Sequence, residues 1–305
     1  MNINLGYACI NMTLHEEEKI QCNRGMIKRT FAKKGLPYAS ELALINANGL
    51  RSIIKWNNKH NIKVYRMTSC LFPWFSEYSI FDLPDIDKIA DIMSETGKLA
   101  MDAGQRLSFH PGPFNCLASP NENVVLKTIK ELNDHSTQMD LMRLPESQMS
   151  KINIHVGGAY GDRESALKRF CKNYYKLSCN TQKRLTVEND DKPSLYSAKM
   201  LVDNISKEIG IPVVFDSHHH ELGPQDLDYH DAFYSARETW SNIGIKQQCH
   251  HSNSKKKYED PKVPAPSHSN WYYTSFENYN EKVDVVLECK RKERALFKYI
   301  NDFGC

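Results

Sequence analysis

Short apolar runs alternate along the chain with longer stretches in which apolar residues recur every three or four positions. The short runs are bounded by polar or turn-forming residues and predict eight strands, at residues 3–10, 62–67, 106–110, 151–156, 184–187, 211–215, 243–249 and 283–287. The longer stretches predict helices, at residues 41–60, 85–103, 122–142, 163–177 and 194–209. Strands that alternate with helices favour a parallel sheet with crossover helices, and eight such strands favour closure into a barrel.

We therefore expect an α/β protein with the (β/α)8 TIM-barrel fold, formed as a single domain over residues 1–305. No segment has the composition of an interdomain linker, and no internal repeat is present. Residues 253–267 are polar, contain three consecutive lysines and three prolines, and predict a long loop after the seventh strand. Loops in this position of a barrel commonly carry functional residues.

The composition is that of an ordinary folded protein. Apolar residues make up 40% of the chain, and the net charge of +3 is compatible with a polyanionic ligand without requiring one. None of the nine cysteines forms a C-x-x-C pair, which favours reduced thiols in the cytoplasm or nucleus. The first residues lack the basic and apolar regions of a signal peptide, and no run approaches the roughly 18 apolar residues of a membrane span. We therefore expect an intracellular protein that is not secreted.

Histidines and carboxylates stand at or just beyond the ends of several predicted strands. The candidates are His110, His155, Glu188, Asp216, His219, His250, His268 and Glu288. Because the carboxyl ends of barrel strands meet at one end of the barrel, these side chains are expected to converge. Imidazole and carboxylate groups together suit divalent transition metals, so the series predicts a metal site. Within it, Glu188 and Glu288 are the candidates for bridging two ions and orienting an activated water.

A single histidine is more often a structural or surface residue than a ligand. We assign that role to His60, His135 and His230. His218, His220 and His251 adjoin better candidates, and the pattern alone leaves their role open.

Several strings of residues match a known family. They are Leu5-Gly6-Tyr7-Ala8-Cys9-Ile10-Asn11, Tyr65-Arg66-Met67-Thr68-Ser69-Cys70-Leu71-Phe72-Pro73-Trp74, Ser108-Phe109-His110-Pro111-Gly112, His155-Val156-Gly157-Gly158-Ala159-Tyr160-Gly161-Asp162, Glu188-Asn189-Asp190-Asp191 and Phe215-Asp216-Ser217-His218-His219. In these motifs the chain resembles the UV damage endonucleases, a branch of the xylose isomerase-like and endonuclease IV-like metal-dependent TIM barrels. The resemblance selects His219 over His218 as the ligand.

The resemblance implies an enzyme that nicks damaged double-stranded DNA directly 5′ to cyclobutane dimers and 6-4 lesions. It implies up to three divalent ions at the eight candidate ligands, with manganese as the first choice and magnesium, cobalt or zinc as alternatives. It also implies that Tyr7 and Asn11 face the damaged dinucleotide or its phosphate and that Arg66, Ser69 and Trp74 line the substrate groove. Neither a membrane nor an obligate protein partner is expected, and the fold suits a monomer.

Two departures from the family pattern change the expected site. Where the family commonly has a lysine that can be carboxylated, two residues before the histidine of the seventh strand, this chain has Gln248, which cannot carry the added carboxylate. Lys246 shares that strand face but lies about 7 Å deeper, which favours a solvated or barrel-core role. Where the family often has glutamine and tyrosine, this chain has Pro113 and Phe114, and Phe114 retains an aromatic wedge that could stack on a base.

The consecutive lysines Lys255, Lys256 and Lys257 could follow DNA phosphates, although a solvated lysine face is an equal alternative. Other functions also remain open. An abasic-site endonuclease of the endonuclease IV type would share the fold and the ligand types. Gln248 also permits a catalytically weakened barrel that binds damage without cutting it. The specific strings matched above argue against a third reading, a sugar-phosphate isomerase on the same barrel.

Overall fold

Eight parallel strands form the centre of the computed structural model, which describes residues 2–304. The strands are β1 (Ile3–Cys9), β2 (Val64–Met67), β3 (Arg106–Ser108), β4 (Ile152–Ile154), β5 (Leu185–Glu188), β6 (Val213–Asp216), β7 (Gln248–His251) and β8 (Val283–Leu287). They are ordered β3-β2-β1-β8-β7-β6-β5-β4. The ring closes between β3 and β4, where the Phe109 amide donates to the Lys151 carbonyl at 2.9 Å and the Asn153 amide donates to the Phe109 carbonyl at 3.0 Å. The predicted barrel is confirmed.

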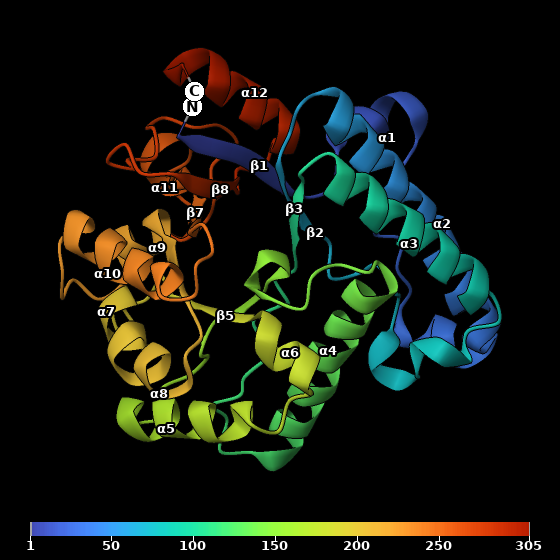
Figure 1. The fold of residues 1–305 in the computed structure, drawn as a ribbon, viewed down its shortest axis with the longest axis horizontal. Helices are drawn as coiled ribbons and strands as arrows, with labels where there is room; N and C mark the ends of the chain where they lie inside the picture. Colours follow the sequence, from blue (N-terminus) through green and yellow to red (C-terminus); the bar gives the residue numbers. More distant parts are fainter. Residues whose placement is uncertain (1, 305) are drawn as a thin grey trace.

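Helices surround this ring, with α1, α2 and α3 on the side opposite α5, α7 and α10 (Figure 1). The α-helices are α1 (Met12–Glu18), α2 (Lys28–Lys59), α3 (Ile86–Asp102), α4 (Glu122–Leu141), α5 (Arg163–Tyr174), α6 (Cys179–Arg184), α7 (Ala198–Leu201), α8 (Lys207–Ile209), α9 (Ser217–Leu222), α10 (Tyr229–Ser241), α11 (Lys255–Tyr258) and α12 (Lys292–Phe303). Short 3-10 turns lie at η1 (Phe75–Glu77), η2 (Ile80–Asp82) and η3 (Gln148–Ser150), and a π-helical turn lies at η4 (Val202–Ser206).

Two predicted helices differ from the observed ones. The helix predicted over 41–60 begins earlier, at Lys28, and is interrupted at Gly35, whose φ of 61° lies outside the helical region. The helix predicted over 194–209 begins only at Ala198, where the Ser197 side chain accepts from the Met200 amide, and it widens into the π-helical turn before α8. Residues 253–267 form the predicted loop except for the single turn α11.

The two faces of the barrel strands have different surroundings. Ile152 and Ile154 of β4 face outward into the apolar core beneath the helices. The alternate positions, such as Lys151 and Asn153, therefore face the barrel interior. At the amino-terminal end of that interior, Asp284 is within 3.1 Å of Arg106 and also pairs with Lys246. Lys246, whose side chain is 34% exposed, therefore lies just before β7 at the amino-terminal end, opposite the end that carries the predicted ligands.

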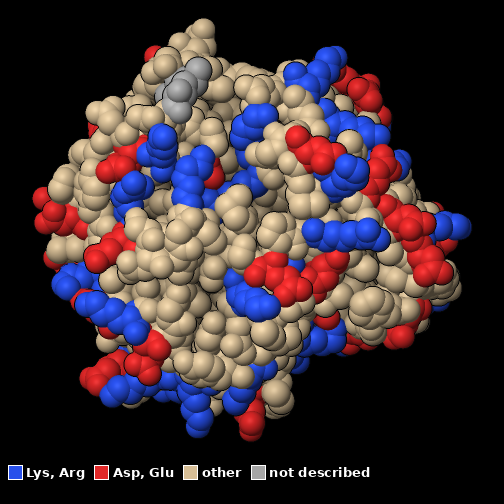
Figure 2. Space-filling model, in the orientation of Figure 1, with Lys and Arg blue, Asp and Glu red and all other residues tan. Residues whose placement is uncertain are grey.

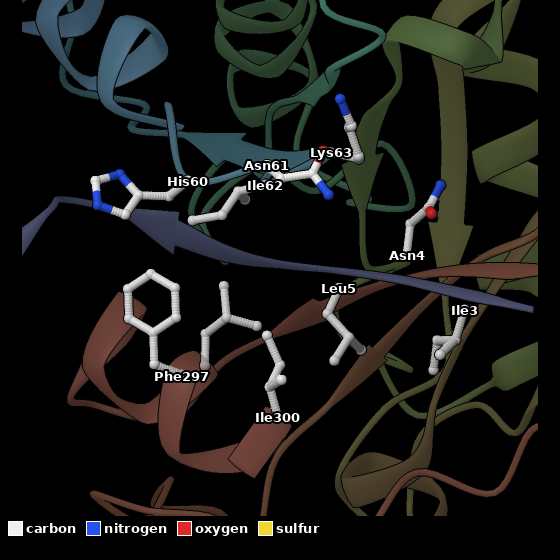
Figure 3. A pocket seen from close by; sticks show the side chains of 10 residues that line it. Ile3, Asn4, Leu5, His60, Asn61, Ile62, Lys63, Phe297 and Ile300 are labelled. Carbon is white, nitrogen blue, oxygen red and sulfur yellow. The ribbon is translucent and has the colours of Figure 1, made fainter. Parts of the chain in front are cut away.

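The amino-terminal end of the barrel also carries an apolar pocket of about 510 Å³. In Figure 3, Phe297 and Ile300 of α12 lie across β1 from His60 and Ile62. This pocket lies at the start of β1 and β2, away from the predicted ligands, and gathers no set of metal-ligating side chains. Figure 2 shows basic and acidic side chains interspersed over one face of the molecule. Among residues 2–304, no helix is both long enough and apolar enough to span a bilayer.

Candidate metal centre

The eight predicted ligands lie together at the mouth of the barrel, the end where the carboxyl ends of the strands meet. Glu188 and Asp216 are the last residues of β5 and β6, and His250 lies in β7. His110, His155 and Glu288 follow β3, β4 and β8 directly or within two residues. His219 lies in α9, and His268 pairs with Ser254 in a short antiparallel bridge. The structure therefore brings together side chains that are separated by up to 178 residues in the sequence.

Glu188 contacts more of these ligands than any other member of the set. Its carboxylate lies 2.9 Å from His110 Nε2, 3.1 Å from His250 Nδ1 and 3.4 Å from His219 Nδ1. Asn153 also donates to this carboxylate, and Thr186 Oγ donates to Asn153 Oδ1 at 2.7 Å, which fixes the amide orientation. Burial raises the pKa of Glu188, but the charges of His250 and His110 outweigh that effect and hold the pKa well below its usual value. Glu188 is therefore a buried anion.

Glu288 forms the second acidic position. Its carboxylate pairs with the Arg66 guanidinium and lies 3.3 Å from His250 Nδ1 and 3.8 Å from His268 Nε2. Burial raises the pKa of Glu288, but the charge of Arg66 and then that of His250 lower it far below its usual value. Arg66 therefore supplies a fixed positive charge at the edge of the site.

Asp216 has a carboxylate oxygen without a partner. Its Oδ1 accepts from the His219 amide at 2.8 Å, which caps α9, whereas its Oδ2 is buried and makes no hydrogen bond to any residue in 2–304. Burial raises the pKa of Asp216 to about 6, against the opposing charge of His219. A buried carboxylate oxygen with no partner is costly unless a cation or a proton satisfies it.

Three groups of donor atoms within the centre lie close enough to hold an ion each, and a fourth, Asp228 with His230 and Asp231, is exposed and shares no residue with them. The three within the centre are His110 with Glu188 and His250, His155 with Glu188 and His219, and Asp216 with His250 and Glu288. Within each group the donor atoms lie within 4.8 Å of one another. Nitrogen and carboxylate oxygen donors of this kind suit Mn, Fe or Zn, and the unpartnered oxygen of Asp216 belongs to one group. The residues present therefore fit divalent metal ions.

Hydrogen bonds orient several of the imidazoles. His268 Nδ1 contacts Ser252 Oγ at 2.6 Å, which leaves Nε2 toward Glu288. His110 Nδ1 contacts the Pro111 carbonyl at 3.2 Å, which leaves Nε2 toward Glu188. A partner on one ring nitrogen commonly fixes the tautomer that presents the other nitrogen to a metal.

Two residues that the sequence analysis did not select belong to this centre. The Asp190 carboxylate lies 3.3 Å from His155 Nδ1. Burial lowers the pKa of His155, but Asp190 and then Glu188 raise it to about 10. Lys151 is fully buried inside the barrel, with its Nζ 3.2 Å from His250 Nε2, and burial lowers its pKa to about 7. The alternation Lys151, Asn153, His155 along one strand face was the signal that could have identified Lys151.

Gln248 lies on the same strand face as His250, two residues before it. Its amide nitrogen and oxygen are both buried and make no hydrogen bond. The position therefore carries no negative charge and no partner for the ligands above it.

Of the predicted DNA-contacting residues, Phe114 is largely exposed, whereas Arg66, Ser69 and Trp74 are partly buried. Arg66 lines a hollow of about 250 Å³ at the mouth, and Phe114 is 88% exposed beside it. Ser69 instead donates to the His110 carbonyl at 3.2 Å, and Trp74 packs against the core. Of the lysines in α11, Lys257 pairs with Glu221 at 2.7 Å, whereas Lys255 and Lys256 have no carboxylate partner within the described residues.

The predicted exposure of Tyr7 and Asn11 to the substrate does not agree with the structure. Tyr7 is fully buried, and its hydroxyl donates to Asn57 Oδ1 at 2.8 Å and accepts from Asn11 Nδ2 at 2.9 Å. Asn11 is 1% exposed and caps α1 by accepting from the Leu14 amide. The two side chains satisfy each other and the helix end, so they support the first loop from within.

Two of the histidines assigned to structural roles lie apart from the centre. His135 is buried in α4 against Phe75 and Phe109. His60 stacks on Trp56 at the amino-terminal end of the barrel.

Comparison with known proteins connects this geometry to one family. The family model described as UV-endonuclease UvdE matches residues 3–304. A UV-damage endonuclease from Schizosaccharomyces pombe is 33% identical over 96% of this chain and 49% of its own length. A UV DNA damage endonuclease from Clostridium perfringens is 29% identical over 98% of this chain and 70% of its own length. The chain thus spans about half the length of the S. pombe relative.

Solved structures agree. The crystal structure of SacUVDE superposes with a TM-score of 0.83 at 28% identity, over 99% of this chain and 98% of that chain. A 3-keto-D-glucoside 4-epimerase from E. coli superposes with a TM-score of 0.54 at 9% identity, over 99% of this chain and 98% of that chain, which shows the shared barrel fold alone. The match over residues 3–304 and the similarity to named UV-damage endonucleases lead to one conclusion: the chain belongs to the UV-endonuclease UvdE family.

Proposed function

We propose that this protein is a metal-dependent endonuclease that nicks double-stranded DNA directly 5′ to UV photoproducts. The observation that carries the proposal is the set of three linked donor groups at the barrel mouth, which share Glu188 and His250. Family membership supplies the substrate class, because the named relatives are UV-damage endonucleases.

We further propose that the eight ligands, His110, His155, Glu188, Asp216, His219, His250, His268 and Glu288, hold up to three divalent ions, with manganese as the first choice. When bound, such ions lower the pKa of a coordinated water and neutralise charge on a phosphodiester. Glu188 and Glu288 would help to hold the ions and orient the attacking water. Arg66, already paired with Glu288, offers its remaining N–H groups to a non-bridging phosphate oxygen.

In this proposal the enzyme selects a lesion by how easily the DNA duplex deforms there. A photodimer stacks and pairs poorly, so lifting its bases out of the duplex costs less than lifting normal bases. Phe114 is exposed in the loop that follows His110 and can stack where the lesion leaves a gap. The enzyme would act as a monomer inside the cell, where its DNA substrate lies.

The test is an incision assay with matched substrates. Purified protein is incubated with manganese and an end-labelled duplex that carries one thymine dimer, one abasic site or no lesion. The proposal requires a nick immediately 5′ to the dimer and none in undamaged DNA. Cleavage restricted to the abasic duplex would favour an endonuclease IV-type activity. Tight binding to the dimer without a nick would favour a damage-binding barrel weakened at Gln248.

A further inference from the structure

Basic residues are concentrated in one segment near the start of the chain. Residues 19–34, the basic segment, contain six cations and no carboxylate: Lys19, Arg24, Lys28, Arg29, Lys33 and Lys34. The whole chain has 40 basic and 37 acidic residues, so the rest has 34 basic against 37 acidic and a net charge of −3. The net charge of +3 is therefore the sum of a strongly positive segment and a slightly acidic remainder.

These cations are exposed, and within residues 2–304 none of them pairs with a carboxylate. Lys34 lies over an aromatic face, with its Nζ 3.8 Å from the centre of the Tyr38 ring. Several lysines elsewhere on the surface pair instead with an acid one helical turn away: Lys98 with Asp102, Lys168 with Glu164, Lys199 with Asp203 and Lys298 with Asp302. An unpaired cationic cluster is typical of a surface that binds a polyanion.

The basic segment is held firmly at the mouth of the barrel. Cys22 Sγ donates to the carbonyl of Cys9, the last residue of β1, at 3.3 Å. Buried Asn46 accepts from the Arg24 amide at 2.8 Å and donates to the Leu71 carbonyl, just beyond β2, at 3.1 Å. A Cβ on Gly49 would meet the Gln21 carbonyl oxygen at 2.1 Å, so only glycine allows this close approach. Such tethering presents the cations from a fixed surface at the carboxyl ends of β1 and β2.

A series of contacts and cavities leads from this segment toward the candidate centre. Phe31, within the segment, stacks on Tyr78 with ring centres 5.8 Å apart. The neighbouring Ser76 and Glu77 line a cavity of about 470 Å³ together with Phe114 and Pro113. Pro113 also lines the hollow at the mouth. A duplex seated on the mouth would therefore pass over the basic segment on the side of β1 and β2.

We propose that the basic segment binds the phosphate backbone of the DNA that flanks the incision site, chiefly through Lys28, Arg29, Lys33 and Lys34. This inference rests on the proposed function for the identity of the polyanion. The contacts are to phosphates, so they strengthen binding of damaged and undamaged duplexes alike. The lysines of α11, by contrast, include one already paired with an acid.

The experiment measures binding without cleavage, through the salt dependence of affinity. Fluorescence anisotropy gives the Kd of a labelled duplex of about 30 base pairs, undamaged or with one thymine dimer, at several concentrations between about 50 and 200 mM KCl. The test variant is K28Q/R29Q. The control is K172Q/K176Q, which removes the same charge from exposed, unpaired lysines at and just beyond the end of α5, on the opposite side of the barrel (Figure 1).

We expect K28Q/R29Q to weaken binding to both duplexes roughly tenfold at low salt. The magnitude of the slope of log K, the association constant, against log KCl concentration should fall by about 1 to 2, and the control should match the wild type. An unchanged slope, or an equal loss in the control, would overturn the inference. So would a variant that loses binding to phosphatidylserine vesicles but not to DNA. Absence of incision with retained, segment-dependent DNA binding would instead contradict only the proposed activity.

Discussion

Glu188 is the single residue on which the contacts of the candidate centre converge. Three imidazoles and the Asn153 amide surround its two oxygens, and it lies in two of the three donor groups. The sequence identified it because a carboxylate ends an apolar strand. Its neighbours come from four other strands and loops, so the number of its contacts could be seen only in the folded chain.

Replacement of this carboxylate by an amide tests its role. Glu188→Gln preserves the size of the side chain but removes the charge, so ion binding and incision should fall by more than the roughly 10- to 100-fold that follows loss of a ligand's hydrogen-bond partner. Incision rate and bound manganese are measured together, with the circular dichroism spectrum as the check on folding. Glu164→Gln, an exposed change on α5, is the control. Full activity in Glu188→Gln would exclude the assigned role.

Lys151 is the residue whose role the structure reveals most clearly beyond the sequence. Its Nζ contacts His250 Nε2, and this contact turns His250 Nδ1 toward Glu188 and Glu288. Lys151→Met should lower manganese affinity by roughly 10- to 100-fold in titration calorimetry. Lys246→Met, which removes the lysine paired with Asp284 at the amino-terminal end of the barrel, should lower stability but leave affinity unchanged. Equal affinity losses in the two variants would mean general damage to the barrel.

At the scale of elements, strand positions were more predictable than helix boundaries. Apolar runs marked all eight strands, and the observed strands lie within or beside the predicted ranges. Helices α10 and α12 were not predicted, although each buries an apolar face that includes Phe233 and Leu296. The break in α2 lies at Gly35, and the π-helical turn η4 joins α7 to α8; apolar spacing does not encode either feature.

Helix α4 provides a pH-dependent test of element stability. His135 on this helix is fully buried, and burial lowers its pKa to about 4 from an ordinary value near 6.5. The unfolded chain therefore binds a proton more readily, and stability is lost as the pH falls from about 6.5 toward 4.

Between pH 7 and pH 5, this histidine should account for a loss of about 2 kcal/mol in the free energy of unfolding. Urea denaturation of wild type and His135→Gln at both pH values measures it, with His15→Gln as an exposed control. The difference in the free energy of unfolding between wild type and His135→Gln should be smaller at pH 5 than at pH 7. A difference that stays constant would show that His135 titrates normally.

At the scale of the whole molecule, barrel closure decides which residues meet. The fold and the ligand types could be predicted because each strand carries its own signal. The contact between Lys151 and His250, and the burial of Tyr7 and Asn11, depend on how β4, β7 and the first loop pack in three dimensions. The net charge of +3 does not indicate the basic segment, because the excess of acidic residues in the rest of the chain offsets most of its six positive charges.

The assembled centre should release protons when it binds metal. The pKa of His155 is raised to about 10, and that of His219 is also raised, because Asp190, Asp216 and Glu188 offset the effect of burial. The His155 ring is therefore protonated at pH 7 without metal, whereas a ligand imidazole must be neutral. Affinity should increase with pH, and the calorimetric enthalpy should depend on the ionisation enthalpy of the buffer. Identical enthalpies in PIPES and Tris would contradict this.

The central claim is that the acids and imidazoles at the barrel mouth hold metal ions, and anomalous diffraction tests it most directly. Crystals grown with manganese are measured on both sides of the manganese absorption edge. We expect anomalous peaks within about 2.0 to 2.6 Å of Glu188 and of the neighbouring imidazoles. A manganese-loaded crystal with no peak at the barrel mouth would contradict the claim.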